Sequence, residues 1–219
     1  MKPYLMQIDL ESKLCLVVGG GPIALHKTRH LVASGARVTL VSSSIHEGFG
    51  ELRLHTQHLR RFEDADIDGM TLVHAATNDP GVNVHIAKLC ADAGIPCCAA
   101  HDTTVGSFSV PAVLDSGDLR ISVSTNGKSP SYGARLRRNI EEQLSENLDA
   151  YLNFLGEARE QSKQQIEDGK LRMRFNAYLA SEEGQLWFEN TEPDERAAEL
   201  EGLMCKPESI SEIFEPRWS

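Results

Sequence analysis

The spacing of hydrophobic positions predicts alternating strands and helices over the first hundred residues. The apolar run at residues 14–18 leads directly into three glycines. A helical pattern follows over residues 24–34, with apolar side chains recurring every three to four positions. Gly35 ends this helix, and residues 37–41 form a second apolar run. The pattern therefore predicts a β-α-β unit over residues 14–41.

The same alternation continues toward residue 100. Polar and apolar positions alternate over residues 52–56, which predicts a third, half-exposed strand. The runs at 70–76 and 95–100 predict a fourth and a fifth strand, separated by a helix that begins at Asp79 and closes at Gly94. Strands that alternate with helices favour an α/β fold with a parallel, doubly wound sheet of the Rossmann type.

The pattern changes in the second half of the chain. Two strand-like runs, 108–114 and 119–124, flank turn-forming residues and predict a hairpin. Ser129 then serves as the expected N-cap of a helix, and the sequence beyond it is polar and helical. We expect three parts, a nucleotide-binding Rossmann domain over residues 1–110, a connecting module over 111–148, and a helical C-terminal region over 149–219.

The glycines after the first strand carry the clearest candidate chemistry. Gly19, Gly21 and Ala24 form a G-x-G-x-x-A pattern between a strand and a helix. The first glycine permits a sharp turn, the second lets a pyrophosphate approach the backbone, and the alanine lets the helix lie close to the strand. We expect the backbone of Gly21, Pro22 and Ile23 to meet the phosphates of a dinucleotide at the helix N-terminus. A purely structural glycine turn is the alternative.

Two further strand ends belong to this candidate site. Ser42, Ser43 and Ser44 follow the second strand, where an acidic residue is typical of NAD sites and an arginine of NADP sites. Their hydroxyls can bond a ribose, but the residues alone leave NAD and NADP open. Thr77 and Asn78 follow the fourth strand, at the edge where ligands of such sheets bind. These two residues could instead only cap the helix that begins at Asp79.

Composition narrows the class of protein. The chain has 219 residues, a formal net charge of −10 and 41% hydrophobic residues, so it supports a substantial core and disfavours nucleic acid as the main partner. No apolar run approaches the roughly 18 residues of a membrane span, and the N-terminus lacks a secretory pattern. Five cysteines without C-x-x-C spacing favour buried, reduced thiols. We therefore expect a cytoplasmic protein without membrane association.

Several sequence blocks, taken in order, resemble the precorrin-2 dehydrogenase / sirohydrochlorin ferrochelatase family, the dehydrogenase part of siroheme synthase. The resemblance covers residues 3 to about 145. Its blocks are residues 16–21 with Ala24 and Lys27, residues 35–39, residues 75–79 with Asn83, Ile95 and Pro96 leading to Asp102, Phe108 with Pro111, residues 121–127 with Ser129 and Pro130, and residues 134–137.

The resemblance implies an enzyme that oxidises precorrin-2 to sirohydrochlorin with NAD+ in siroheme and tetrapyrrole biosynthesis. It further implies that the 111–148 module mediates a homodimer and that the substrate is a polycarboxylate tetrapyrrole. Many members also insert ferrous iron, so a bifunctional dehydrogenase and ferrochelatase is an alternative. A nucleotide-sensing regulatory domain is a third reading, which would need the glycine turn alone.

The resemblance also places candidate catalytic residues after the fifth strand. Family members carry an aspartate that is tied to both activities at the position of His101, and Asp102 is its neighbour here. An imidazole with a pKa of about 6.5 can accept a proton as a carboxylate does, but it brings no negative charge to metal insertion. Dehydrogenation is therefore compatible with His101, and chelation is left open. The alternative is that His101 is only a polar strand end.

Substrate contacts are expected after the second hairpin strand. Ser124 and Thr125 stand where the family has Ser or Thr, and Lys128 and Arg135 belong to a basic cluster that would attract carboxylates. Ordinary turn chemistry and a solvated helix face are the alternatives. The histidines are scattered without metal-ligand spacing, so no resident metal is expected.

Overall fold

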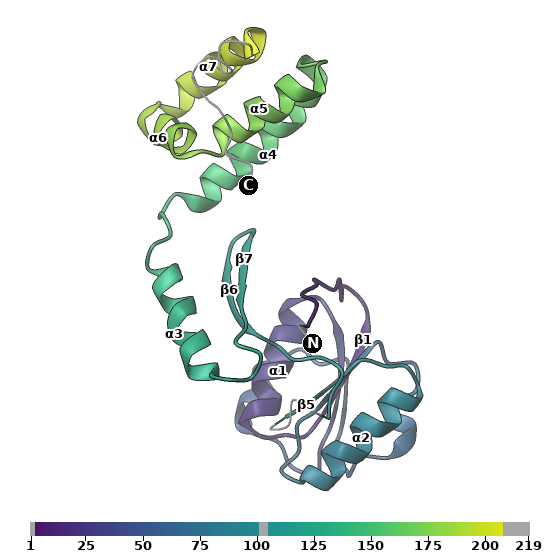
Figure 1. The fold of residues 1–219 in the computed structure, drawn as a ribbon. Helices are drawn as coiled ribbons and strands as arrows, with labels where there is room; N and C mark the ends of the chain where they lie inside the picture. Colours follow the sequence, from purple (N-terminus) through teal and green to yellow (C-terminus); the bar gives the residue numbers. More distant parts are fainter. Residues whose placement is uncertain (1–2, 101–104, 208–219) are drawn as a thin grey trace. The chain divides into compact units, whose positions relative to one another are not determined.

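The computed structural model describes residues 3–100 and 105–207, and the chain divides into two compact units (Figure 1). The first unit comprises residues 1–111 together with 124–130. The second comprises residues 112–123 and 131–219. Each unit has its own architecture and is described separately.

A five-stranded parallel sheet forms the centre of the first unit. Its strands lie in the order β3-β2-β1-β4-β5, so the chain moves outward from β1 in one direction and then crosses to the other side. All four strand pairs are parallel. This topology confirms the predicted Rossmann-type α/β fold. The strands are β1 (Leu14–Val18), β2 (Arg37–Val41), β3 (Thr56–His58), β4 (Leu72–Ala75) and β5 (Cys97–Ala99).

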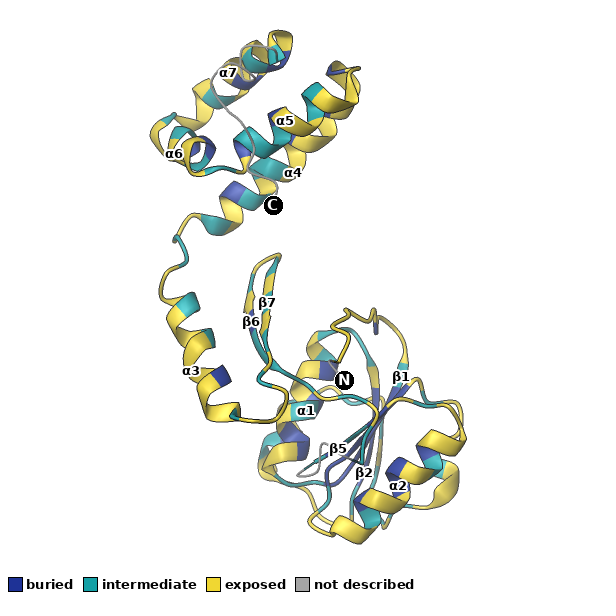
Figure 2. Cartoon of the chain, viewed as in Figure 1, coloured by how far each residue is buried: buried dark blue, intermediate teal, exposed yellow. Residues whose placement is uncertain are grey.

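Two helices cover the two faces of this sheet (Figure 1). Helix α1 (Pro22–Ala33) buries Ala24, Leu25 and Leu31 against one face. Helix α2 (Pro80–Asp92) packs against the other, together with the short 3-10 helix η2 (Asp64–Ile67). The inner strands β1, β2 and β4 are buried on both sides except at Leu14 and Arg37, as Figure 2 shows, which explains their nearly continuous apolar sequences. The edge strand β3 is only half-buried.

The third strand differs from the sequence prediction. Alternation placed it over residues 52–56, but β3 is Thr56–His58. Leu52 and Leu54 instead follow the 3-10 helix η1 (Glu47–Glu51) and pack, half-buried, against the core on the α1 face. Leu52 and Leu54 therefore alternate because an irregular segment packs against the core at both positions. The strand begins after this segment, at Thr56.

The second unit consists of a hairpin and five helices among the described residues. Strands β6 (Ala112–Ser116) and β7 (Leu119–Val123) pair antiparallel around Gly117, which has a φ of 54°. The hairpin is confirmed, although β6 begins four residues later than predicted. The helices are α3 (Pro130–Glu141), α4 (Leu148–Gln165), α5 (Gly169–Leu179), α6 (Glu182–Asn190) and α7 (Pro193–Cys205).

Helices α4 to α7 share a separate apolar core. Phe175 and Leu179 of α5 are almost fully buried against Ala158 of α4 and Leu200 of α7. Side-chain caps fix the starts of α5 and α6: the Asp168 carboxylate accepts hydrogen bonds from two backbone N–H groups of α5, and the Ser181 hydroxyl accepts one from Gly184 of α6. Helices α4 to α7, over residues 148–205, thus form a packed helical unit.

Three of the five cysteines are buried free thiols, as expected from the sequence. Cys15, Cys90 and Cys97 are buried free thiols, and burial raises the pKa of the Cys15 thiol to about 11. Cys98 is half-buried and Cys205 is exposed. No helix in the described part of the chain is both long and apolar enough to cross a bilayer.

A histidine, His74, lies inside the sheet core. It sits on β4 between Val17 of β1 and Cys98 of β5, and only 4% of it is exposed. Its ring contacts Phe108 edge-on, with the ring centroids 5.5 Å apart. Burial, reinforced by the charges of Lys27 and then His30, lowers the pKa of His74 to about 4. His74 is therefore neutral at pH 7.

Candidate functional site

The turn after β1 contains two glycines that no other residue could replace without displacement. Gly19 has a φ of 120°, and a Cβ there would lie 2.2 Å from the carbonyl oxygen of Ala76. A Cβ on Gly20 would lie 1.9 Å from the carbonyl oxygen of Ser44. The turn is thus held between the segments that follow β4 and β2. Gly20 was not singled out from the sequence, because its constraint comes from a distant segment.

Gly21 differs from its two neighbours because a Cβ there would meet no atom within 4 Å. It is the N-cap of α1, in extended conformation, and no side chain caps this helix. Pro22 occupies the first helical position, and the first turn contains no acidic residue. The N–H groups of Ile23 and Ala24 have no carbonyl partner within the helix. Open space beside free N–H groups is the arrangement that binds anions.

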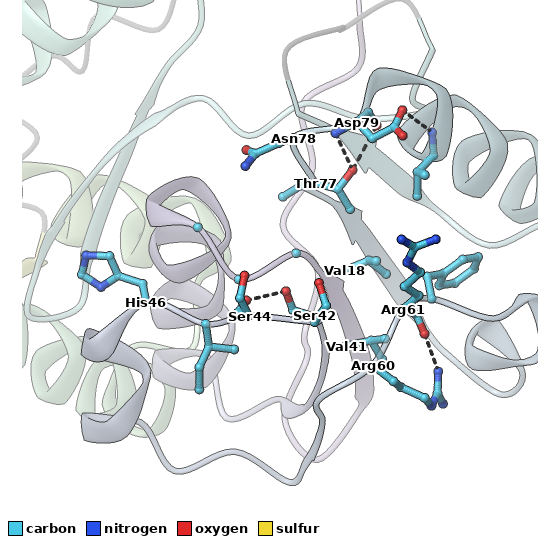
Figure 3. Close-up of a pocket in the computed structure, with 18 residues that line it drawn as sticks. Val18, Val41, Ser42, Ser44, His46, Arg60, Arg61, Thr77, Asn78 and Asp79 are labelled. Atoms are coloured by element: carbon cyan, nitrogen blue, oxygen red, sulfur yellow. Dashed lines mark hydrogen bonds between the residues drawn. The ribbon is translucent and has the colours of Figure 1, made fainter.

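A cavity of about 660 Å³ opens at this point, beside the carboxyl ends of β1, β2 and β4 (Figure 3). The topology reverses direction between β1 and β4, which is where open parallel sheets bind ligands. The volume lies within the range of small-molecule sites. The lining residues are Val18, Gly19, Gly20, Gly21, Val41, Ser42, Ser43, Ser44, Ile45, His46, Arg60, Arg61, Phe62, Ala76, Thr77, Asn78, Asp79 and Val82.

Three serines form the β2 side of the cavity. Ser42 donates a hydrogen bond from its hydroxyl to the carbonyl oxygen of Ser44 at 2.6 Å, as Figure 3 shows. This bond shapes the turn against which Gly20 packs. Ser43 and Ser44 are exposed within the lining. The structure therefore gathers all three predicted serines at the cavity, with no carboxylate beside them in the lining.

The β4 side shows which residue caps α2. Asp79 accepts hydrogen bonds at Oδ1 from the N–H groups of Gly81 and Val82, at 2.8 and 3.3 Å. The Thr77 hydroxyl accepts a hydrogen bond from the Asp79 N–H at 3.2 Å and lies 2.8 Å from Oδ1 of the buried Asn83, so it bonds no N–H group of α2 itself. Capping is thus the role of Asp79, and Thr77 and Asn78 lie in the cavity lining. Thr77 is fixed in place by Asn83, and Asn78 is exposed, with its side chain directed away from Thr77 (Figure 3).

Two arginines in the lining were not predicted from the sequence. Arg60 and Arg61 follow β3, whose end lies beside that of β2 because Val41 pairs with His58. The sequence placed the third strand at residues 52–56, so its carboxyl end was expected several residues too early. A strand predicted over residues 56–58 would have directed attention to this basic pair.

The remaining predicted site residues lie elsewhere. His101 and Asp102 fall outside the described residues. Ser124, Thr125 and Lys128 belong to the first unit and are absent from the cavity lining, and Thr125 accepts a hydrogen bond at Oγ1 from the Ser129 N–H at 3.0 Å. Turn chemistry thus explains at least part of the role of Thr125.

Arg135 lies on α3 in the second unit, with its guanidinium 5.0 Å above the ring centre of Tyr132. Within residues 3–100 and 105–207, no group of three or more His, Cys, Asp or Glu side chains could hold a metal ion.

Comparison with known proteins identifies family models and relatives that this chain resembles. Residues 6–112 match a family model described as "Putative NAD(P)-binding", and residues 116–143 match one described as "Sirohaem biosynthesis protein central". The siroheme synthase of Thioalkalivibrio sulfidiphilus is 37% identical over 169 residues, which cover 76% of this chain and 35% of that protein. The siroheme synthase of Tolumonas auensis is 38% identical over 167 residues, covering 76% and 36%.

A solved structure shares the fold. It is described as SirC, precorrin-2 dehydrogenase, and it superimposes with a TM-score of 0.72 at 22% sequence identity, covering 93% of this chain and all of that one. The chain spans only about a third of the length of the siroheme synthases that it matches.

Proposed function

Because this chain belongs to the siroheme synthase family, of which it spans the NAD(P)-binding and central regions, we propose that it oxidises precorrin-2 to sirohydrochlorin with NAD+. The observation that carries the proposal is the open backbone at Gly21, beside an uncapped helix N-terminus in a cavity at the switch point of the sheet. This arrangement fits a dinucleotide pyrophosphate and has no role in packing that would explain it otherwise.

The residues of the cavity would divide the work of holding the cofactor. The backbone of Gly21 and Ile23 would bind the pyrophosphate, and the serines after β2 would bond the adenosine ribose. Asn78, on the β4 side, would contact the other half of the dinucleotide. The bound cofactor supplies the acceptor for a hydride, so the task of the protein is to orient the substrate against it.

We propose that His101 accepts the proton that accompanies hydride transfer, with Asp102 as its neighbour and the next candidate. Oxidation removes a hydride and a proton from the substrate, so the reaction needs a proton acceptor; a neutral imidazole can take the proton, and solvent is the alternative acceptor. We further propose that Ser124, Thr125, Lys128 and Arg135 contact the polycarboxylate substrate. Lys128 and Arg135 are both exposed, as carboxylate-binding side chains must be before the substrate arrives.

Anaerobic oxidation of precorrin-2 with NAD+, followed by absorbance with and without Fe²⁺ or Co²⁺, tests the reaction. We expect sirohydrochlorin and NADH in equal amounts. If His101 is the base, the rate rises as the pH passes its pKa, at about 6–7, and His101→Ala loses both the rate and this pH limb. His101→Asp retains oxidation.

The controls separate the parts of this proposal. Full oxidation by His101→Ala with an unchanged pH profile would remove His101 as the base and leave Asp102 to be tested. Metal-dependent conversion of sirohydrochlorin would establish the bifunctional alternative, which adds a chelatase to the dehydrogenase. An absence of NADH with intact precorrin-2 would contradict the dehydrogenase itself.

We also propose that the protein is a cytoplasmic homodimer formed through the 111–148 module. Support comes from the half-buried side chains of both hairpin strands and from Tyr132 and Leu136, which are exposed on α3 by 50% and 37%. Such apolar surface is stabilised when a second copy covers it. Light scattering over a concentration series should give twice the 24.1 kDa chain mass, and a constant mass of one chain would exclude the dimer.

A further inference from the structure

We infer that Arg61 equips the cavity to bind a ribose 2′-phosphate, so that the chain binds NADP+ as well as NAD+. The inference rests on the proposed dinucleotide site and concerns the part of the cavity that is lined by the segments after β2, β3 and β4. Two observations support it. The first is the distribution of charge in the cavity lining, and the second is that only one of the two arginines after β3 is paired with a carboxylate.

The first observation is the distribution of charge around the cavity. NAD sites discriminate against a 2′-phosphate with a carboxylate after the second strand, which bonds the ribose hydroxyls and repels the phosphate. Serines occupy those positions here. The sole carboxylate among the described lining residues is Asp79, which lies after β4 and already accepts two backbone hydrogen bonds. Nothing in the lining beside β2 would therefore repel a phosphate.

The second observation is that Arg60 forms ion pairs with carboxylates, whereas Arg61 forms none with the described residues. Arg60 holds Asp66 with both terminal nitrogens, at 2.8 and 2.6 Å, and lies 3.9 Å from Glu63. This pairing holds the pKa of Asp66 below its usual range, so the pair stays charged and its charges cancel at pH 7. The guanidinium of Arg61 makes no ion pair within 4 Å with a carboxylate of the described residues.

The two side chains also take different directions. In Figure 3 the guanidinium of Arg61 extends toward the segment that carries Thr77 and Asp79, whereas that of Arg60 points away from this segment and donates a hydrogen bond to the carbonyl oxygen of Arg61. Both residues line the cavity, and Ser43 is exposed on its β2 side. An uncommitted guanidinium that can form two parallel N–H···O bonds, together with serine hydroxyls, is the donor set that a phosphate monoester requires.

Calorimetric titration of the full chain with NADP+ and with NAD+ tests this inference directly, without depending on catalysis. We expect both dinucleotides to bind. Arg61→Ala should weaken NADP+ binding by about tenfold or more and change NAD+ binding by less than about threefold, because hydrogen bonds to charged groups are worth that much. Arg53→Ala, at an exposed arginine outside the lining, is the matched control and should change neither.

A second variant tests the same point by adding charge. Ser43→Asp places a carboxylate after β2, and it should weaken NADP+ binding more than NAD+ binding, because the carboxylate repels the 2′-phosphate. The small probes 2′,5′-ADP and 5′-AMP, which differ only in the 2′-phosphate, should show the same preference for the 2′-phosphorylated ligand in the wild type and its loss in Arg61→Ala.

Three results would overturn the inference. If NAD+ binds and NADP+ does not, the cavity holds a dinucleotide but takes no 2′-phosphate. If Arg61→Ala weakens both dinucleotides equally, Arg61 contacts a part that they share, such as the adenine or the pyrophosphate. If neither dinucleotide binds, the dinucleotide site itself is wrong, and the proposed function falls together with the inference.

Discussion

Gly21→Asp is expected to abolish dinucleotide binding and precorrin-2 oxidation while the protein remains folded. Gly21 has the extended backbone of an N-cap, and its Cβ would project into open space, so the aspartate enters without a clash. Its carboxylate would cap the first turn of α1 and occupy the N–H groups that the pyrophosphate needs. The negative charge also repels the phosphates. We expect NAD+ affinity to fall by about a hundredfold or more.

Two matched variants separate this effect from damage to the fold. Gly21→Ala adds only a Cβ to the same open space, and it should retain the melting temperature and part of the NAD+ affinity. Gly20→Ala forces a Cβ to within 1.9 Å of the Ser44 carbonyl oxygen, and it should destabilise the protein by about 2–3 kcal/mol. Unchanged NAD+ binding by a folded Gly21→Asp variant would show that the cofactor lies elsewhere.

His74→Leu is expected to remove a large part of the acid sensitivity of the first unit. The pKa of His74 is about 4 in the folded protein and about 6.5 when unfolded, because burial disfavours its charged form. Between these values the unfolded chain binds a proton that the folded chain does not, so stability falls as the pH falls from 6.5 to 4. The difference corresponds to about 3 kcal/mol.

Chemical denaturation of both proteins between pH 4 and pH 8 measures this contribution. His26 also has a lowered pKa, through burial and the nearby charge of His30, and it is present in both proteins, so the comparison isolates His74. Asp66 loses its stabilising charge mainly below pH 4, since Arg60 lowers its pKa. Wild type should lose stability more steeply than His74→Leu over pH 4–6.5, and parallel curves would show that His74 is not kept neutral.

Local patterns predicted the part of the site that is built from consecutive residues. The apolar run into the glycine turn, and the helix after it, specify β1 and α1 because strand, turn and helix signals are adjacent in the sequence. The serines and the Thr77 segment were found because they directly follow strands whose ends meet at one edge of the sheet.

What the sequence could not show depends on contacts between distant segments. The need for glycine at position 20 arises from Ser44, and the fixed position of Thr77 arises from Asn83 of the next helix. Arg60 and Arg61 were missed because two core-contacting leucines imitated the alternation of a strand, which displaced the predicted end of β3. Each of these features depends on tertiary packing between distant segments, and the local periodicity of the sequence carries no information about such packing.

A crystal structure of the protein with NAD+ bound tests the central claim most directly. Our account predicts electron density for the pyrophosphate beside Gly21 and the first turn of α1, with the adenosine ribose against Ser42, Ser43 and Ser44 and the nicotinamide half toward Asn78. Density for the dinucleotide at any other place in the molecule, or a cavity that stays empty at saturating NAD+, would contradict it.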